Sequence, residues 1–342
     1  MMIAGLEGRI KQEGRGRERF CLFRTGERGK LLNLKPEQYG KVETMRNWML
    51  GVVGMAVACA MGAGMDDVVA PGTKAEKLAD GFTFTEGATV NAAGELFFVD
   101  QPNNKILRWS REQGLRTFME PAGRANGMCF MADGTLLACA DEKMELWAIT
   151  PESKVTVIAK GHAGKELNGP NDVWPRPQGG CYFTDPFYKR PWWTHKEAPQ
   201  GTRQVYFLPP GGTPRRVTED LVQPNGIVGT PDGTALYVAD IDAKKVYAYD
   251  IQADGALGNK RLFCEMGSDG MTLDVDGRLY LTGKEGVYVF DKAGVSLGVI
   301  AIPENWSANV CIGGPKKDTL FVTASKGFYA VPLKVKGTAQ GK

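Results

Sequence analysis

The sequence predicts an all-β protein with the fold of a six-bladed β-propeller. Short runs rich in Val, Leu, Phe and Tyr alternate with Gly-containing turns, which is typical of strands and not of helices. One pattern recurs six times with a period near 40 residues, and such a period for each four-stranded unit indicates a propeller blade. A stacked β-solenoid is the main alternative, but its repeat is usually shorter.

Each repeat opens on a polar residue, which is followed by Gly in four of the six repeats and begins an apolar run. These index residues are Glu86, Asn126, Asn171, Asn225, Asp269 and Asn309, spaced by 40, 45, 54, 44 and 40 residues. A turn follows, and the second run reads ELFFVD, TLLACA, GCYFTD, ALYVAD, RLYLTG and TLFVTA in successive repeats. The third run reads KILRWS, ELWAIT, QVYFLP, KVYAYD, GVYVFD and GFYAVP.

The last repeat supplies only about three strand-like runs before the chain becomes polar near Lys336. A fourth strand must therefore come from elsewhere, and residues 74–79, just before the first repeat, are suited to it. We expect a propeller domain over residues 74–335, with its ring closed by an N-terminal strand that completes the last blade. A polar tail over residues 336–342 would follow.

The residues before the propeller divide into three predicted segments. Residues 1–44 carry ten Lys or Arg and six Asp or Glu without an apolar period, which predicts disorder. Residues 45–64 have a basic start, a short apolar run and small residues at the end, which is typical of a signal peptide and too short for a membrane span. We therefore expect initiation at Met45, a misassigned upstream extension over 1–44, and a linker over 65–73.

This signal peptide predicts a secreted or periplasmic protein. Cleavage is expected after Ala60 or near Gly64, and a lipid anchor at Cys59 is the alternative. The net charge of the whole chain is +3, but residues 1–64 hold eleven basic and six acidic side chains. The remaining 31 basic and 33 acidic side chains give −2, so a nucleic-acid partner is not indicated.

The predicted mature chain contains five scattered cysteines without the spacing of a metal site. Their odd number argues against a complete disulfide framework, so we expect free buried thiols, with a Cys129–Cys139 pair as the alternative. They are Cys129, Cys139, Cys181, Cys264 and Cys311.

In a propeller the innermost strands run along the central axis, so the index residues are expected to converge at one mouth of the channel. They are two carboxylates and four carboxamides, which suit Ca²⁺, whereas Zn²⁺ prefers His or Cys. We predict one divalent cation, Ca²⁺ before Mg²⁺, Mn²⁺ or Zn²⁺. The alternative is that Asn and Asp before Gly only form turns, which does not account for Glu86.

Several motifs resemble the SMP-30/gluconolactonase family, which includes luciferin-regenerating enzymes and is related to squid-type diisopropylfluorophosphatase. They are EGA at Glu86, LNGPNDV with CYFTDP around Asn171, QPNGI at Asn225 and SDGMTLDVDG at Asp269, in family order between about Lys74 and Leu333. The resemblance implies a six-bladed propeller with a catalytic divalent metal, usually calcium. Carried over by motif, the ligands would be Glu86, Asn171, Asn225 and Asp269, with Asn126 beside them in contact with substrate.

The resemblance also implies metal-dependent hydrolysis of a lactone, such as a sugar lactone. Asp269 would orient or deprotonate the attacking water, and Asn171 would also contact substrate. Phosphotriester hydrolysis at the same metal and a non-catalytic binding propeller with structural calcium are the alternatives. A small-molecule substrate is the expected partner, and the sequence indicates no oligomeric state.

The longest insertion, FYKRPWWTHKEAPQG in the third repeat, is expected to shape the substrate site. Its aromatic residues could form a wall over the mouth, with Tyr188 and Trp192 as substrate contacts beside Trp193 and His195. The alternative is a surface loop that packs its tryptophans on the edge of the blade.

Overall fold

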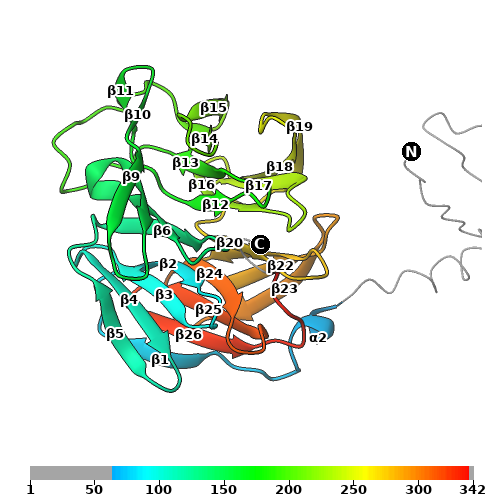
Figure 1. The fold of residues 1–342 in the computed structure, drawn as a ribbon. Coiled ribbons are helices and arrows are strands. Elements are labelled where there is room, and N and C mark those ends of the chain that lie inside the picture. The colour runs from blue at the N-terminus through cyan, green and yellow to red at the C-terminus, as the bar shows by residue number, and fades with distance from the viewer. Residues whose placement is uncertain (1–63, 339–342) are drawn as a thin grey trace, which may run out of the picture. The chain divides into compact units, whose positions relative to one another are not determined.

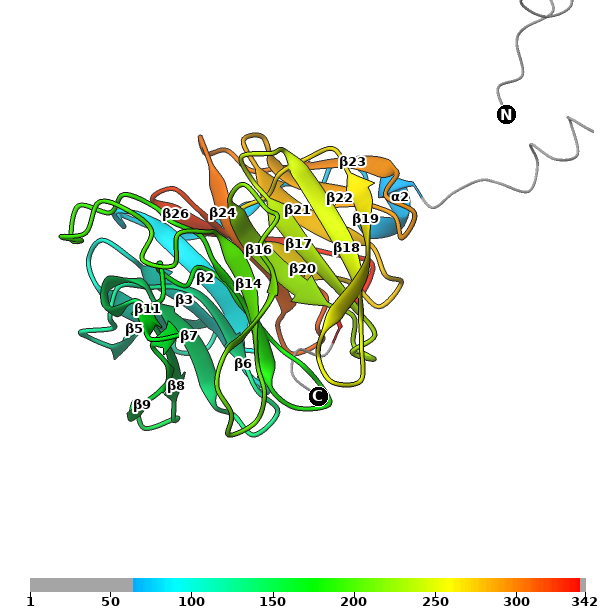
Figure 2. The same ribbon diagram turned by 90° about the horizontal axis from the view of Figure 1, so that it is seen from above.

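The computed structural model of the protein describes residues 64–338, so the predicted upstream extension and signal peptide lie outside the described residues. Six antiparallel four-stranded sheets surround a common axis, with β2, β6, β12, β16, β20 and β24 innermost (Figures 1 and 2). The predicted six-bladed propeller is therefore confirmed.

Within the first five blades the strands follow one another along the chain from the axis outward. Blade 1 holds β2 (Thr85–Val90), β3 (Leu96–Asp100), β4 (Lys105–Ser110) and β5 (Gly114–Met119), and blade 2 holds β6 (Ala125–Phe130), β7 (Leu136–Ala140), β8 (Glu145–Ile149) and β9 (Val155–Ala159). Blade 3 holds β12 (Val173–Pro175), β13 (Cys181–Asp185), β14 (Gln204–Leu208) and β15 (Arg215–Thr218). Between blades 2 and 3 lies a small hairpin of β10 (Gly161–His162) and β11 (Lys165–Glu166).

The second half of the ring repeats the same order. Blade 4 holds β16 (Pro224–Gly229), β17 (Ala235–Asp240), β18 (Lys245–Ile251) and β19 (Leu257–Cys264), and blade 5 holds β20 (Met271–Leu273), β21 (Leu279–Gly283), β22 (Gly286–Phe290) and β23 (Ser296–Ala301). Blade 6 combines β24 (Ser307–Gly313), β25 (Thr319–Ala324) and β26 (Gly327–Pro332) with β1 (Glu76–Asp80).

The outermost strand of blade 6 comes from the N-terminal end of the propeller. β1 pairs antiparallel with β26, with Glu76 opposite Ala330 and Asp80 opposite Gly327. The strand begins two residues later than the segment 74–79 that the sequence suggested. The hydroxyl of Thr85 also donates to the carbonyl of Gly327, 2.9 Å away, so the first and last blades are hydrogen-bonded beside this strand.

The segments predicted as a linker and a polar tail both make contacts with the propeller. Residues 65–73, predicted as a linker, contain the short helix α2 (Met65–Val68), and Val68 is fully buried against apolar residues of blades 5 and 6. The backbone N–H of Lys334 donates to the carbonyl of Val68 at 2.8 Å. The four-residue helix is too short to show a period in sequence, so only its packing reveals it.

The predicted polar tail also makes backbone contacts where it is described. Gly337 forms a β-bridge with Asp274, and the N–H of Val275 donates to the carbonyl of Lys336 at 2.9 Å. These contacts join residues 336–338 to the inner strand of blade 5, at the end of the strand opposite Asp269.

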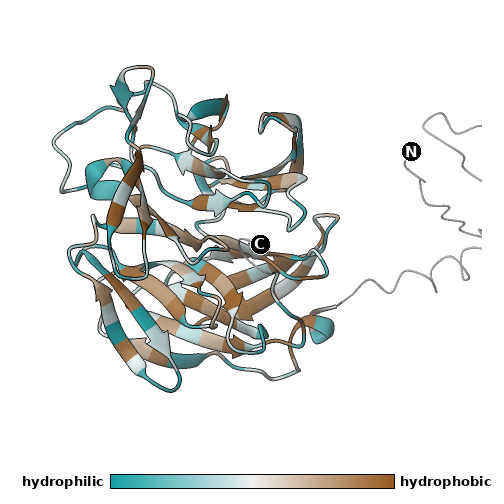
Figure 3. Cartoon of the chain, viewed as in Figure 1, coloured by the Kyte–Doolittle hydropathy of each residue, from teal (hydrophilic) through white to brown (hydrophobic). Residues whose placement is uncertain are grey.

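The apolar core lies between the blades. Figure 3 shows hydrophobic residues along the strands and hydrophilic residues on the β10–β11 hairpin and α2. Phe98 of blade 1 and Phe328 of blade 6 are fully buried, with ring centres 4.6 Å apart. Each such side chain stabilises the fold by about 3 kcal/mol through burial. All five cysteines of this region are buried, and none of them forms a disulfide within residues 64–338. No helix in that part of the chain is long and apolar enough to cross a membrane.

Candidate active site

The index residues lie in or directly before the inner strands, at points where the strand ladder is irregular. The register shifts between Glu86 and Thr89 in blade 1 and between Pro224 and Ile227 in blade 4. A β-bulge of this kind bends the strand and redirects a side chain. Glu86 and Asn225 are thus strand residues and not turn residues, which counts against the turn interpretation of the motif.

The glycines after the index residues allow neighbouring inner strands to approach closely. A Cβ atom at Gly226 would lie 2.5 Å from the carbonyl oxygen of Asp269, and one at Gly127 would lie 2.6 Å from that of Asn171. The N–H of Gly127 donates to this Asn171 oxygen at 2.7 Å. No side chain fits at these positions, so the Asn-Gly pairs are required by backbone approach between blades.

Three carboxylates at the ends of second strands fix the backbone just before an index residue. Asp240 accepts hydrogen bonds from the N–H groups of Val222 at 2.8 Å and Gln223 at 2.9 Å. The same arrangement recurs one and three blades earlier, with Asp185 bound to the N–H groups of Asn168 and Gly169, and Asp100 to those of Thr83 and Phe84. These strand-end carboxylates, Asp100, Asp185 and Asp240, position Glu86, Asn171 and Asn225.

The two acidic index residues interact unfavourably with each other. Glu86 is only 4% exposed, and its burial together with the nearby Asp269 raises the pKa of Glu86 well above its usual range. Burial also raises the pKa of Asp269, against the opposing hydrogen bond that Trp306 Nε1 donates to Asp269 Oδ2 at 2.8 Å. Two ionised carboxylates in this position are costly unless a cation lies between them.

The amide of Asn225 provides the test of whether a cation fits here. Its Nδ2 donates to the hydroxyl of Tyr188 at 2.8 Å, while its Oδ1 is buried and accepts no hydrogen bond from residues 64–338. A buried carbonyl oxygen without a donor is unusual, and a hard cation would satisfy it. Within the described chain no three His, Cys, Asp or Glu side chains cluster, so a cation would depend on amide oxygens.

The remaining amides of the ring divide into two kinds. The side chains of Asn126 and Asn171 are 2% and 3% exposed and make none of the hydrogen bonds found in residues 64–338, so their amide groups are available. Asn309 Oδ1 instead accepts from the N–H of Val310 at 2.8 Å and is occupied by the backbone. The groups able to offer oxygen to a divalent cation are therefore Glu86, Asn126, Asn171, Asn225 and Asp269, and they include the four ligands that the motif resemblance implies, Glu86, Asn171, Asn225 and Asp269.

The loop between β13 and β14 contributes two of its four predicted wall residues. Tyr188 reaches the ring through Asn225, and Trp192 is half-buried beside it. Trp193 is 5% exposed and stacks between Phe187 and His195, with ring centres 5.8 and 4.7 Å away. Trp193 and His195 therefore pack within the loop, as the alternative interpretation expected, and only Tyr188 and Trp192 remain candidates for substrate contact.

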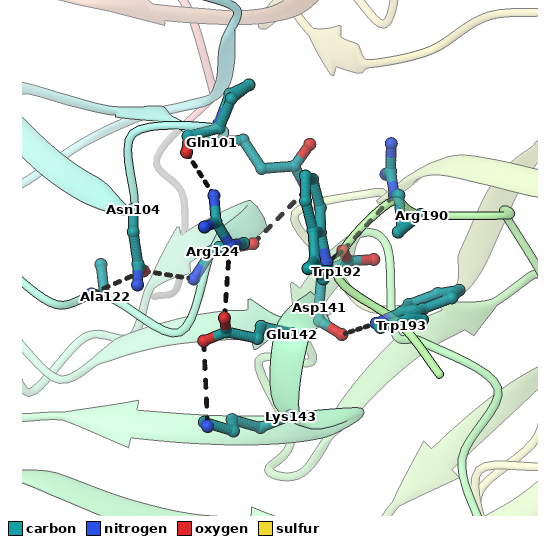
Figure 4. A network of polar contacts seen from close by, with 11 residues as sticks. Gln101, Asn104, Ala122, Arg124, Asp141, Glu142, Lys143, Arg190, Trp192 and Trp193 are labelled. Carbon is teal, nitrogen blue, oxygen red and sulfur yellow. Dashed lines mark hydrogen bonds and ion pairs between the residues drawn. The ribbon is translucent and has the colours of Figure 1, made fainter. Parts of the chain in front are cut away.

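Three side chains of the site were not singled out in the sequence. Trp306 binds the carboxylate of Asp269, while Arg190 and Asp141 lie together in the polar network of Figure 4. Burial raises the pKa of Asp141 to about 6, and Arg190 opposes this shift. A signal for Asp141 existed, since it follows the second run of its repeat where three other repeats end in Asp.

Comparison with known proteins identifies a family and several relatives of this chain. Residues 84–326, which include all six index residues, match the sequence profile described as the SMP-30/Gluconolactonase/LRE-like region. Over 302 residues the chain is 27% identical to a gluconolactonase of Zymomonas mobilis, covering 80% of this chain and 85% of the relative.

Solved structures agree with this match. A gluconolactonase structure from Xanthomonas campestris superposes with a TM-score of 0.73 at 26% identity and covers 79% of this chain and 92% of that one. The structure of regucalcin from Agrobacterium tumefaciens, described as a calcium-binding protein, shares the fold with a TM-score of 0.67 at 18% identity, over 78% of this chain and 96% of its own.

Proposed function

Because the chain belongs to the SMP-30/gluconolactonase/LRE-like family, we propose that it hydrolyses a lactone with the help of one divalent cation. The gluconolactonases among its relatives identify the reaction class as hydrolysis of a carboxylic ester. The observation that carries the proposal is the pairing of two buried carboxylates, Glu86 and Asp269, with the unpartnered Oδ1 of Asn225. This arrangement is unfavourable without a cation and favourable with one.

The residues that would hold the cation are Glu86, Asn171, Asn225 and Asp269. All four offer oxygen, which favours Ca²⁺ over Zn²⁺, and a calcium-binding relative with the same fold supports this choice. When bound, the cation supplies positive charge that stabilises the oxyanion developing on the ester carbonyl oxygen.

Asp269 is the proposed acceptor for the proton of the attacking water. Its Oδ2 accepts the hydrogen bond from Trp306, which orients the carboxylate. Burial raises the pKa of this carboxyl group above its usual range, whereas a bound cation would favour the ionised form, which is the form that accepts a proton. Trp306 is thus a positioning residue for the proton transfer.

The proposed substrate contacts are Asn126, Asn171, Tyr188 and Trp192. The two amides can donate to ring or carbonyl oxygens of a lactone, because their side chains have no other partner in residues 64–338. Tyr188 is joined to the ring by the hydrogen bond from Asn225, and Trp192 lies in the same loop with Arg190 near both aromatic rings. Aromatic side chains of this kind pack well against the apolar faces of sugars.

Export remains a further part of the proposal. It rests on the signal-like residues 45–64, and cleavage at or before Gly64 would leave the buried Val68 in the mature protein. N-terminal sequencing of the protein recovered from the periplasm or medium, with a test for lipid on Cys59, would decide between cleavage and anchoring.

The central experiment is an assay of D-glucono-1,5-lactone and related lactones with protein starting near Met65. Chelation should abolish turnover, and Ca²⁺ should restore it better than Mg²⁺, Mn²⁺ or Zn²⁺. Asp269→Asn should lose turnover, while Asp250→Asn, an exposed carboxylate paired with Arg261, should not. A phosphotriester in the same panel tests the second reaction class, and lactone turnover that survives chelation would contradict the metal site.

A further inference from the structure

The loop between β13 and β14 is fastened to the neighbouring blade through Asp141, the first residue of the short 3₁₀ helix η2 (Asp141–Lys143). Asp141 is 1% exposed. Trp192 Nε1 donates to its carboxylate at 3.0 Å, and Trp193 Nε1 donates to its backbone carbonyl at 2.9 Å (Figure 4). Two indole groups bound to one buried residue fix the loop segment that carries Arg190.

Asp141 contacts the guanidinium group of Arg190 along one edge only. Its Nε lies 3.4 Å from Asp141 Oδ2, and its Cζ lies 4.9 Å from the ring centre of Tyr188 and 5.7 Å from that of Trp192. Its two terminal amino groups donate none of the hydrogen bonds found in residues 64–338, and Figure 4 shows them turned away from Asp141. The side chain is 21% exposed, so the open edge of the group is accessible.

The charge of Arg190 acts on the cation site. It lowers the pKa of Glu86 and of Asp269, in each case against the larger raising effect of burial. Tyr188, against which Arg190 stacks, accepts the hydrogen bond from Asn225 Nδ2. Arg190 is therefore separated from one predicted cation ligand by a single side chain.

A second guanidinium lies on Trp192 but is already engaged. Arg124 has its Cζ 4.7 Å from the ring centre of Trp192, its Nε 3.3 Å from Glu142 Oε1, and a hydrogen bond to the carbonyl of Pro102. Among the described residues around Trp192, Arg190 thus differs in having two terminal amino groups without a partner.

We propose that Arg190 determines substrate specificity, with the open edge of its guanidinium binding an anionic oxygen group, a carboxylate or phosphate, carried by the lactone. The inference rests on the proposed lactonase function and adds the substrate class. A planar guanidinium binds such groups through two parallel hydrogen bonds, and stacking on Tyr188 and Trp192 fixes its plane beforehand. Asp141 is the positioning residue that sets its orientation.

The test compares lactones that differ in charge, using the Ca²⁺-loaded protein. D-Glucaro-1,4-lactone carries a carboxylate, 6-phospho-D-glucono-1,5-lactone a phosphate, and D-glucono-1,5-lactone neither. In Arg190→Met, kcat/KM for the anionic lactone should fall about 10- to 100-fold, mainly through KM, because a charge-assisted hydrogen-bond pair is lost. Arg190→Lys should fall less, since the charge remains without the two-pronged geometry.

The neutral lactone and a distant arginine serve as controls. Arg190→Met should reduce turnover of D-glucono-1,5-lactone clearly less than that of the anionic lactones, because the effect of the lost charge on Glu86 and Asp269 is common to all three substrates. Arg261→Met, which changes an exposed arginine paired with Asp250, should change turnover of neither kind of substrate. The relative losses for the carboxylate and the phosphate lactone show which anion the site prefers. Equal losses on neutral and anionic lactones would overturn the proposal, because they would indicate only a disturbed loop.

A binding measurement separates this inference from the proposed reaction. Titration with D-glucuronate and with uncharged D-glucose, followed by tryptophan fluorescence, measures binding without requiring turnover. Saturable binding of glucuronate that is weaker in Arg190→Met would support the anion site. It would do so even if no lactone is hydrolysed, and in that case only the proposed reaction fails. Equal binding of both sugars by the wild-type protein, or no binding of either, would overturn the role of Arg190.

Discussion

The inner strands of blades 1, 3 and 4 are held differently from those of blades 5 and 6. In the first group a strand-end carboxylate accepts two backbone N–H groups just before the index residue, as Asp240 does before Asn225. In blades 5 and 6 the second strand ends in Gly283 or Ala324, and a threonine hydroxyl near its end accepts a single N–H, as Thr282 Oγ1 does from Gly270 at 2.9 Å.

This difference divides the proposed cation ligands into two kinds. Glu86, Asn171 and Asn225 are positioned through their backbone, whereas Asp269 is positioned at its own carboxylate by Trp306. Asp269, the residue proposed to accept a proton, is thus the one whose side chain is held by an indole N–H. For the other three ligands, a carboxylate forms charge-assisted hydrogen bonds with the backbone just before the residue. The comparison leads to four predictions, and the first concerns the ring itself.

Glu86→Gln should have the largest effect, with turnover reduced about 10²- to 10³-fold because the cation loses one of two carboxylates. The same variant should be more stable than the wild-type protein after chelation at pH 7, since burial opposes ionisation of Glu86. Melting curves with and without Ca²⁺ check both effects. An unchanged Ca²⁺-dependent rise in melting temperature would show that Glu86 is not a ligand.

Asp240→Ala should cost about 3 kcal/mol of the free energy of unfolding, because two backbone N–H groups lose a buried charged acceptor. Thr282→Val, the matched change in blade 5, should cost about 1 kcal/mol because only neutral hydrogen bonds are lost. Urea unfolding of both variants in Ca²⁺ measures the difference. Equal costs would mean that the two ways of holding an inner strand are equivalent.

Gly226→Ala should destabilise the protein by about 2 kcal/mol, because the new methyl group would overlap the carbonyl of Asp269 in the next blade. Gly134→Ala gives a comparison in an exposed turn, where nothing surrounds the added atom but φ is +85°. The activity of Gly226→Ala should fall more than that of Gly134→Ala, since only the first shifts a proposed ligand. Lactone assays at saturating Ca²⁺ provide the measurement.

The smallest effect concerns the dependence of stability on pH after chelation. Burial raises the pKa of Asp172 to about 7 and, together with Asp269, raises that of Glu86. Groups whose pKa is higher in the folded state stabilise it below their unfolded pKa, and this contribution is lost as pH rises through the folded value. The melting temperature of the chelated protein should therefore fall by about 5 °C between pH 5 and pH 8.

Saturating Ca²⁺ should remove or reverse this trend, because the cation favours the ionised carboxylates that burial disfavours. A melting temperature that rises with pH after chelation would contradict the assigned pKa directions. Measurements at fixed ionic strength prevent surface charges from producing the same slope.

The fold and the positions of the index residues could be predicted from the sequence, because both follow from a repeated pattern. Six Gly-containing copies of one pattern predict six blades, and the residue at the start of each copy must face the axis whatever its identity. Asn309 has the same position in its repeat, but its amide oxygen accepts a hydrogen bond from the N–H of Val310. This local hydrogen bond could not be predicted from the repeat.

The contacts that could not be predicted join loops of different blades. Arg190 meets Asp141 from blade 3 to blade 2, and Trp306 meets Asp269 from blade 6 to blade 5. Neither contact corresponds to a repeated spacing in the sequence, because each of the loops that make these contacts occurs only once. For the same reason Trp192 and Trp193, adjacent in sequence, could not be assigned separately to the site and to the base of the loop.

The pairing of β1 with β26 also has a consequence for biosynthesis. Thr85 and Gly327, which are hydrogen-bonded beside this strand pair, are 242 residues apart, so the ring stays open until almost the whole chain has been made. At ordinary rates of translation this interval is about 12 to 50 s. During that time the growing chain cannot complete its last blade, so closure of the ring can only follow the synthesis of Gly327.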